Sequence, residues 1–304
     1  MAWQGRISEA GARIAGHVRR TPVMQVELGG YSVALKLEQM QHTGSFKARG
    51  AFNTLLQVAV PGAGIVAASG GNHGAAVAYA AARLGQRARI YVPEIAGPAK
   101  IALIRAQGAD LQVVPGAYAE AAARAAEWRA ATGAMAVHPY DAETTVAGQG
   151  TVMAEWEDQG LSADTVLIAV GGGGLIAGAL GWLGARRRVV AVEPETSCAL
   201  HAALAAGAAV DVEVSGVAAN ALGARRIGAV CFDLALAQAV RSVLVRDADI
   251  LAAQALLWRE LRQLVEPAGA TALAALLSGA YRPAVGERVA VLICGGNITP
   301  DPLG

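Results

Sequence analysis

The chain has 304 residues, of which 54% are hydrophobic and 16% charged, and its formal net charge is +1. This length is enough for two α/β domains of ordinary size or for one large one. The near-neutral charge gives no electrostatic case for binding nucleic acid or an anionic membrane surface, and the apolar stretches are interrupted well before the ~18 residues that a membrane span needs.

The cysteines and the N-terminal residues indicate the compartment. Cys198, Cys231 and Cys294 are widely spaced and show neither a metal-binding spacing nor a disulfide framework, which favours a reducing environment. Residues 1–16 carry charged side chains at helical spacing and lack the apolar core of a signal peptide, so they predict an N-terminal helix of the mature protein. We therefore expect a cytoplasmic protein.

The first half of the chain alternates short apolar runs with Ala-rich helical stretches. The run 33–38 alternates apolar and polar residues, as a half-buried strand does. Beyond it, strands are predicted at 64–69, 88–92 and 111–114, and helices at 73–84, 99–107 and 118–131. Gly108 and Gly133 stand where the last two of these helices are expected to end. This alternation predicts a small parallel sheet flanked by helices.

A second series of strands and helices is expected after Gly148-Gln149-Gly150. Strands are predicted at 165–170, 188–193 and 288–293, helices at 151–159, 175–183 and 250–265, and irregular structure at 195–230. The predicted fold class is α/β, with two domains that each contain a mainly parallel twisted sheet flanked by helices. The small domain is expected to span 53–140, and the large one 1–52 and 141–304.

Four consecutive glycines, Gly171 to Gly174, follow an apolar strand and precede a helix. Glycines let successive backbone N–H groups converge on an anion, and a helix N-terminus adds a favourable partial charge. A flexible tight turn is one alternative. A nicotinamide site is another, weakened because the glycines form a run rather than G-x-G-x-x-G. A Walker-type phosphate site is excluded, since no Gly-Lys-Ser/Thr follows.

Two further glycine-rich turns carry polar side chains. In Ser69-Gly70-Gly71-Asn72-His73-Gly74, backbone N–H groups are suited to a carboxylate and the Asn72 amide to a phenolic oxygen, although an ordinary turn with a helix cap fits equally. Cys294 follows a buried strand, where a free Cys usually serves packing. Its place in Cys294-Gly295-Gly296-Asn297, at the carboxyl end of that strand, makes it a site candidate.

Lys47 lies in Gly44-Ser45-Phe46-Lys47-Ala48-Arg49-Gly50, directly after the first predicted strand. A single lysine is usually a solvated surface charge, but the three glycine-rich turns favour a site. An amine that can form a Schiff base, combined with a glycine phosphate cradle, fits pyridoxal phosphate.

On these motifs the chain resembles the fold-type II pyridoxal-phosphate enzymes of the serine/threonine dehydratase and serine racemase group. The resemblance runs from Arg20-Thr21-Pro22 to Cys294-Gly295-Gly296-Asn297, and the most specific match is the lysine motif. It implies a tryptophan synthase β-like fold, pyridoxal 5′-phosphate as the cofactor and a homodimer.

The resemblance also assigns roles to single residues. Lys47 would be the catalytic, Schiff-base lysine. The cofactor would be bound by Phe46 beside the ring, Asn72 at the 3′ oxygen, Gly171, Gly172, Gly173 and Gly174 at the phosphate, and Cys294 at the pyridine nitrogen. The substrate carboxylate would be bound by Ser69, Asn72 and His73, largely through backbone N–H groups. Glu266 matches a glutamate that lines the family's site, without a clear role.

The residue types favour elimination over transamination. A neutral thiol opposite the pyridine nitrogen cannot hold it protonated as an Asp would, so the ring is a weaker electron sink. We expect Lys47 to take the α-proton and the β-hydroxyl to leave with help from the cofactor phosphate. The expected enzyme is a dehydratase (ammonia-lyase) that converts a small β-hydroxy amino acid, L-serine or L-threonine, to a 2-oxo acid and ammonia.

The sequence departs from the family's pattern at several positions. Gly70 stands where racemases of the group carry a serine, so racemisation should be weak. Glu193 matches the first ligand of the family's divalent-cation site, but Ala199 stands at the second, so no metal is expected. Residues 217–221 replace the Ala-Asp-Gly of many relatives, which leaves the substrate open. The chain ends at Gly304, without the regulatory domain of biosynthetic threonine dehydratases, so isoleucine feedback is not expected.

Alternatives remain open at this point. Within the same family they are a hydroxyaspartate dehydratase and an amino-acid racemase, and beyond it a β-replacement synthase, against which the form of the lysine motif argues. A non-catalytic cofactor- or amino-acid-binding protein would keep the glycine turns but would not need Lys47. The expected partners are a small amino-acid substrate and a second copy of the chain, with no nucleic acid and no membrane.

Overall fold

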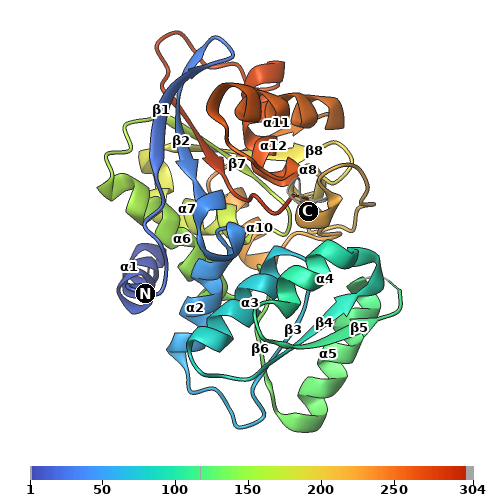
Figure 1. Cartoon of the computed structure of the whole chain (residues 1–304). Helices are drawn as coiled ribbons and strands as arrows, with labels where there is room; N and C mark the ends of the chain where they lie inside the picture. The colour runs from blue at the N-terminus through green and yellow to red at the C-terminus, as the bar shows by residue number, and fades with distance from the viewer. Residues whose placement is uncertain (1, 117, 299–304) are drawn as a thin grey trace.

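The computed structural model describes residues 2–116 and 118–298. Two sheets lie in separate lobes, joined by helices and by the chain around residue 140 (Figure 1). The smaller sheet has the order β5-β4-β3-β6, and its strands are all parallel. The strands are β3 (Ile65–Ala68), β4 (Ala88–Pro93), β5 (Asp110–Val114) and β6 (Met135–Ala136). The predicted small parallel sheet is confirmed, with β6 added at its edge.

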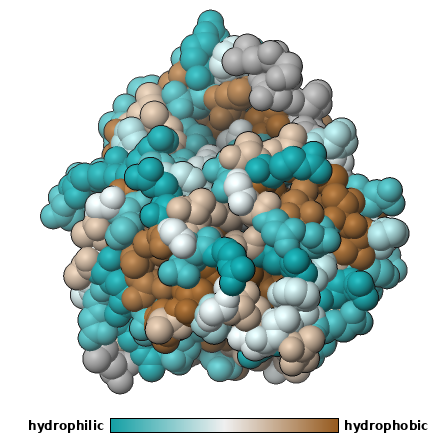
Figure 2. All heavy atoms as spheres, turned by 60° about the horizontal axis from the view of Figure 1, so that its bottom comes forward, coloured by the Kyte–Doolittle hydropathy of each residue, from teal (hydrophilic) through white to brown (hydrophobic). Residues whose placement is uncertain are grey.

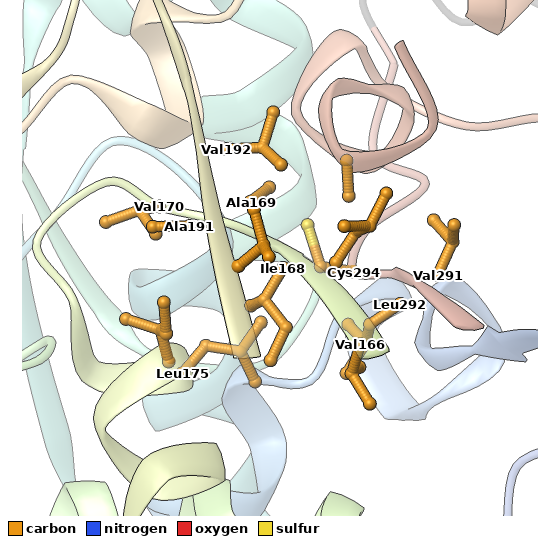
Figure 3. Packing of buried hydrophobic residues seen from close by; sticks show 14 of the residues in the cluster. Val166, Ile168, Ala169, Val170, Leu175, Ala191, Val192, Val291, Leu292 and Cys294 are labelled. Carbon is orange, nitrogen blue, oxygen red and sulfur yellow. The ribbon is translucent and has the colours of Figure 1, made fainter. Parts of the chain in front are cut away.

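The larger sheet has the order β1-β2-β10-β7-β8-β9, and only β1 is antiparallel to its neighbour. Its strands are β1 (Val23–Leu28), β2 (Tyr31–Leu37), β7 (Thr165–Ala169), β8 (Arg188–Pro194), β9 (Arg241–Val245) and β10 (Val289–Ile293). Every residue of β7 and β10 is buried, as expected for parallel strands covered by helices on both faces. Their side chains form the centre of the larger core, where Val166 and Ile168 lie near Val291 and Leu292 (Figure 3).

Helices cover both sheets (Figure 1). Around the smaller sheet they are α3 (Asn72–Arg83), α4 (Pro98–Arg105) and α5 (Tyr118–Thr132), with the 3₁₀ turn η3 (Glu94–Ala96). The others are α1 (Trp3–Ile14), α2 (Lys47–Gln57), α6 (Glu143–Asp158), α7 (Gly174–Leu183), α8 (Ala199–Ala206), α9 (Ala219–Leu222), α10 (Ala229–Ala237), α11 (Asp247–Leu261) and α12 (Pro267–Ser278), with the 3₁₀ turns η1 (Glu38–Met40), η2 (His42–Gly44) and η4 (Gly184–Arg186). No helix in the described ranges is long and apolar enough to cross a membrane.

Two predictions about helices were wrong. Helix α6 begins at Glu143 rather than at 151, because Gly148 and Gly150 are contact points inside it and not a break. A Cβ on Gly148 would lie 2.7 Å from the backbone oxygen of Arg49 in α2, and one on Gly150 would lie 2.9 Å from that of Gly178 in α7. The segment 195–230 was expected to be irregular, but it contains α8, α9 and the start of α10.

Helix α2 joins the two lobes, since it packs on α3 of the smaller lobe and on α6 of the larger one. The strands of the smaller sheet all lie within residues 53–140, and those of the larger sheet lie outside this range. We propose that 53–140 forms one domain and that 1–52 with 141–304 forms the other, so that the boundary falls inside α2. Lys47, the first residue of α2, is thus at the junction of the lobes.

Candidate active site

Lys47 is held at the N-terminus of α2 by the turn that follows β10. The backbone N–H of Phe46 donates to the Cys294 oxygen at 3.3 Å, and the Gly296 N–H donates to the Gly44 oxygen at 2.9 Å. The side-chain Nζ of Lys47 donates to the backbone oxygen of Pro139 at 2.7 Å. Burial lowers the pKa of Lys47 to about 8. A substantial part of the amine is therefore neutral near physiological pH, as a nucleophile or a base requires.

The four glycines connect β7 to α7 in a turn with no space for side chains. A Cβ on Gly171 would lie 2.8 Å from the Leu222 Cα, and one on Gly172 would lie 2.3 Å from the Tyr140 ring. Gly173 has φ +93°, and a Cβ there would meet the Cys231 sulfur at 2.4 Å. No side chain within the described residues caps the start of α7. The first N–H groups of this helix thus form a cradle suited to an anion.

Asn72 begins α3 at the carboxyl end of β3. Its Nδ2 donates to the Oε1 of Glu266 at 2.5 Å, and its Oδ1 accepts from the Nδ2 of Asn297 at 2.8 Å. The hydroxyl oxygen of Ser69 accepts from the backbone N–H of Gly71 at 3.2 Å. No side chain in the described part of the chain caps α3 either. The backbone N–H groups at this turn are therefore suited to a carboxylate, as the sequence predicts.

The side chain of His73 faces the smaller lobe. Its Nε2 lies 2.9 Å from the backbone oxygen of Val137. Because a carbonyl oxygen only accepts, Nε2 carries the proton in this contact. Burial lowers the pKa of His73 to about 3. The imidazole is therefore neutral and already paired, and only the backbone N–H of His73 is suited to bind a substrate.

Cys294 and Glu266 are buried groups at the same place. The Cys294 thiol donates to the Ala268 oxygen at 3.4 Å, and burial raises its pKa, so the thiol stays neutral. Figure 3 shows the sulfur beside Ile168 and Ala169 of β7. Burial also raises the pKa of Glu266 to about 7. Glu266 directly precedes Pro267 at the start of α12, a helix-start pattern in the sequence that marks its position but not its role.

One cavity brings most of the predicted residues together. Of the predicted set it is lined by Phe46, Lys47, Asn72, Gly171, Gly172, Gly173, Gly174 and Cys294. Ser69 and His73 are not among the lining residues, although they flank Asn72 in the turn. The lining also includes residues for which the sequence predicted no role, namely Tyr140, Ala169, Leu175, Ile176, Ala221, Leu222, Glu266 and Ala268.

These residues fit pyridoxal phosphate. They supply an amine with a lowered pKa, a glycine turn that any Cβ would fill, a buried neutral thiol and an amide. An aldehyde with a phosphate and a ring nitrogen requires groups of these kinds. The role of each residue stays a prediction.

Glu193 serves as a helix cap. Its Oε1 accepts from the Leu200 N–H and its Oε2 from the His201 N–H, both at 2.8 Å, at the start of α8. The hydroxyl of Ser242 also donates to Oε2, at 3.1 Å. Within the described residues no three or more His, Cys, Asp or Glu side chains are grouped so that they could hold a metal ion.

Comparisons with known proteins agree with this site. The family described as "pyridoxal-phosphate dependent enzyme" matches residues 14–295. The chain is 37% identical to the phenylserine dehydratase of Ralstonia pickettii, over 94% of this chain and 90% of that protein. It is 34% identical to the L-threonine ammonia-lyase of Geobacter sulfurreducens, over 96% of this chain and 75% of that protein.

Solved structures with the same fold include two with related names. The maize serine racemase is similar with a TM-score of 0.92 and 30% identity, over 99% of this chain and 95% of that chain. A bacterial threonine deaminase, from the organism abbreviated T.th., is similar with a TM-score of 0.89 and 35% identity, over 98% of this chain and 99% of that chain.

Proposed function

We propose, since this chain belongs to the family of pyridoxal-phosphate dependent enzymes, that it is a dehydratase of a small β-hydroxy amino acid. In the overall reaction the substrate loses its β-hydroxyl and its amino group and gains a keto oxygen from water. The products are a 2-oxo acid and ammonia. The relatives named phenylserine dehydratase and L-threonine ammonia-lyase support this reaction class.

The strongest support from the site is the position of the Lys47 amine. It lies at the same cavity as the glycine cradle and the buried thiol of Cys294. When bound to Lys47 through its aldehyde, pyridoxal phosphate would withdraw electrons from the α-carbon of the substrate. With a pKa of about 8, Lys47 is suited to take a proton from that carbon near neutral pH.

The other residues bind and orient. The glycine cradle would hold the phosphate through backbone N–H groups, and the Asn72 turn would hold the substrate carboxylate. The neutral thiol of Cys294 would leave the ring nitrogen unprotonated, which favours loss of a β-substituent over transamination. We propose that this difference in charge at one atom selects elimination.

L-serine and L-threonine are our proposed substrates, and phenylserine follows from the name of one relative. The cavity is lined by apolar Phe46, Ala221 and Leu222, which suit a hydrogen, methyl or aromatic group on the β-carbon better than the carboxylate of hydroxyaspartate. Racemisation is disfavoured because Gly70 has no side-chain proton to give. A Cβ there would also lie 2.5 Å from the Ala96 Cβ, so a serine would require η3 to shift.

We also propose that the protein is a cytoplasmic homodimer. All three cysteines are free, which suits a reducing compartment. Apolar side chains gather in patches between hydrophilic ones on the face shown in Figure 2, and such patches often mark contact surfaces. Light scattering on the purified protein measures the mass: twice that of the chain supports the dimer, and the mass of one chain contradicts it.

Borohydride treatment tests the site. The reagent reduces a lysine–cofactor imine to a stable amine, and peptide mapping then identifies the modified residue. Modification at Lys47 supports the proposal, whereas modification at another lysine, or none, contradicts it. Incubation with an activated serine and sulfide tests the alternative of β-replacement, which would yield cysteine instead of pyruvate.

A further inference from the structure

Four groups form a continuous hydrogen-bonded chain beside the cavity. The Nδ2 of Asn297 donates to the backbone oxygen of Thr43 at 2.7 Å and to the Oδ1 of Asn72 at 2.8 Å. The Nδ2 of Asn72 then donates to the Oε1 of Glu266 at 2.5 Å. The chain therefore connects the segment before Lys47, the start of α3 and the start of α12.

The direction of these bonds follows from the chemistry of the two ends. A backbone carbonyl such as that of Thr43 only accepts, so the amide nitrogen of Asn297 must face it. That nitrogen also faces Asn72, which must present its Oδ1 in return. The Nδ2 of Asn72 is then directed to Glu266, whose ionised carboxylate also only accepts. Both ends thus require the same orientation of the Asn72 amide.

The position of Asn297 is closely defined by its surroundings. A Cβ on Gly44 would lie only 2.4 Å from the Oδ1 of Asn297, so the amide packs directly on the backbone before Lys47. Gly44 also has φ +74°, which favours glycine there for a second reason. The Gly296 N–H, next to Asn297, donates to the Gly44 oxygen at 2.9 Å. The Asn297 amide is thereby fixed relative to the lysine segment.

We propose that Asn297 is a positioning residue that fixes the amide of Asn72 so that a ligand in the cavity meets an N–H donor and not a carbonyl oxygen. One N–H of Asn72 is used by Glu266, and the second remains for the ligand. The inference rests on the proposed function, in which that ligand is the phenolic oxygen of pyridoxal phosphate. A donor at this position stabilises the ionised form of that oxygen.

The test replaces Asn297 in the holoenzyme and measures the bound cofactor directly. Asn297→Asp keeps the size but loses both donated hydrogen bonds, and Asn297→Ala removes them without adding charge. Asn53→Asp is a matched control, because the Nδ2 of Asn53 also donates to a backbone oxygen, that of Thr144, at 2.6 Å, and Asn53 does not line the cavity. The measurements are the ratio of visible to near-ultraviolet absorbance of the bound cofactor and its dissociation constant.

We expect Asn297→Asp to lower the absorbance ratio and to weaken cofactor binding about ten- to hundredfold, the usual value of a hydrogen bond to a charged group. Asn297→Ala should change both in the same direction by less. Asn53→Asp should lower the melting temperature of the cofactor-free protein and leave the ratio unchanged. A wild-type ratio and affinity in both Asn297 variants would overturn the inference. A wild-type protein that binds no pyridoxal phosphate would instead overturn the proposed function.

Discussion

Arg49 holds Glu38 with two hydrogen bonds inside the protein: Nε donates to Oε2 at 2.8 Å and Nη2 donates to Oε1 at 2.7 Å. Both side chains are almost fully buried, with exposures of 1% and 0%. Arg49 lies two residues after Lys47, and Glu38 directly follows β2. This ion pair therefore ties the lysine helix to the larger sheet, and Glu155 and Lys36 extend it.

Arg49→Met is expected to lower the free energy of unfolding by about 3–5 kcal/mol, because it leaves the buried Glu38 carboxylate without its partner. Urea unfolding measures this. The double variant Arg49→Met with Glu38→Gln should lose less than the sum of the two single variants, since they remove one shared interaction. Additive losses would show that the pair does not act as a unit.

Gly173→Ala should weaken cofactor binding and lower the melting temperature. The new Cβ would lie 2.4 Å from the Cys231 sulfur, in a backbone conformation with φ +93°. Strain of this kind costs about 1–3 kcal/mol. Gly184→Ala is the control, because it also has positive φ but nothing lies within 4 Å of its Cβ position. Equal cofactor affinity in the two variants would contradict the cradle.

His73 should make the protein less stable in mild acid. Its pKa is about 3 in the folded protein, against about 6.5 in the unfolded chain. Between these values the unfolded state binds more protons, so stability is present above pH 6.5 and falls as the pH drops, by up to about 1.4 kcal/mol per pH unit. His73→Gln keeps a donor for the Val137 oxygen and does not titrate. Its unfolding free energy should depend less on pH between 6.5 and 4, and an unchanged slope would contradict this role.

Metal removal should leave the enzyme active, because both carboxylate oxygens of Glu193 are occupied by the N–H groups of α8. Activity assays with a chelator and with added Mg²⁺ measure this directly. Glu193→Ala should lower the free energy of unfolding by about 1–2 kcal/mol through loss of the cap. Strong activation by Mg²⁺ that Glu193→Ala abolishes would instead indicate a metal site.

Local patterns were enough to predict the two parallel sheets and the residues that line the cavity. Apolar runs mark β3, β7 and β10, and the glycine turns after β3 and β7 are visible as letters in the sequence. The cap of α8 was not predictable, because Glu193 lies at the end of a strand and reaches N–H groups seven and eight residues later.

Other features depend on contacts between distant segments. Gly148 and Gly150 look like a helix break, but they lie inside α6 because α2 and α7 approach there. The pairing of Asn297 with Asn72 has no local signal, since it joins residues more than two hundred positions apart. Burial, which sets the pKa values of Lys47, His73 and Glu266, likewise arises only in the folded chain.

The most direct test of the central claim is the release of keto acid from a panel of L- and D-serine, L- and D-threonine, phenylserine and 3-hydroxyaspartate. Wild-type protein loaded with pyridoxal phosphate should release pyruvate from L-serine or 2-oxobutyrate from L-threonine, and Lys47→Ala should release neither. No keto acid from any member of the panel, with the cofactor visibly bound, would contradict the proposed dehydratase. Turnover by Lys47→Ala at the wild-type rate would contradict the assigned role of this lysine.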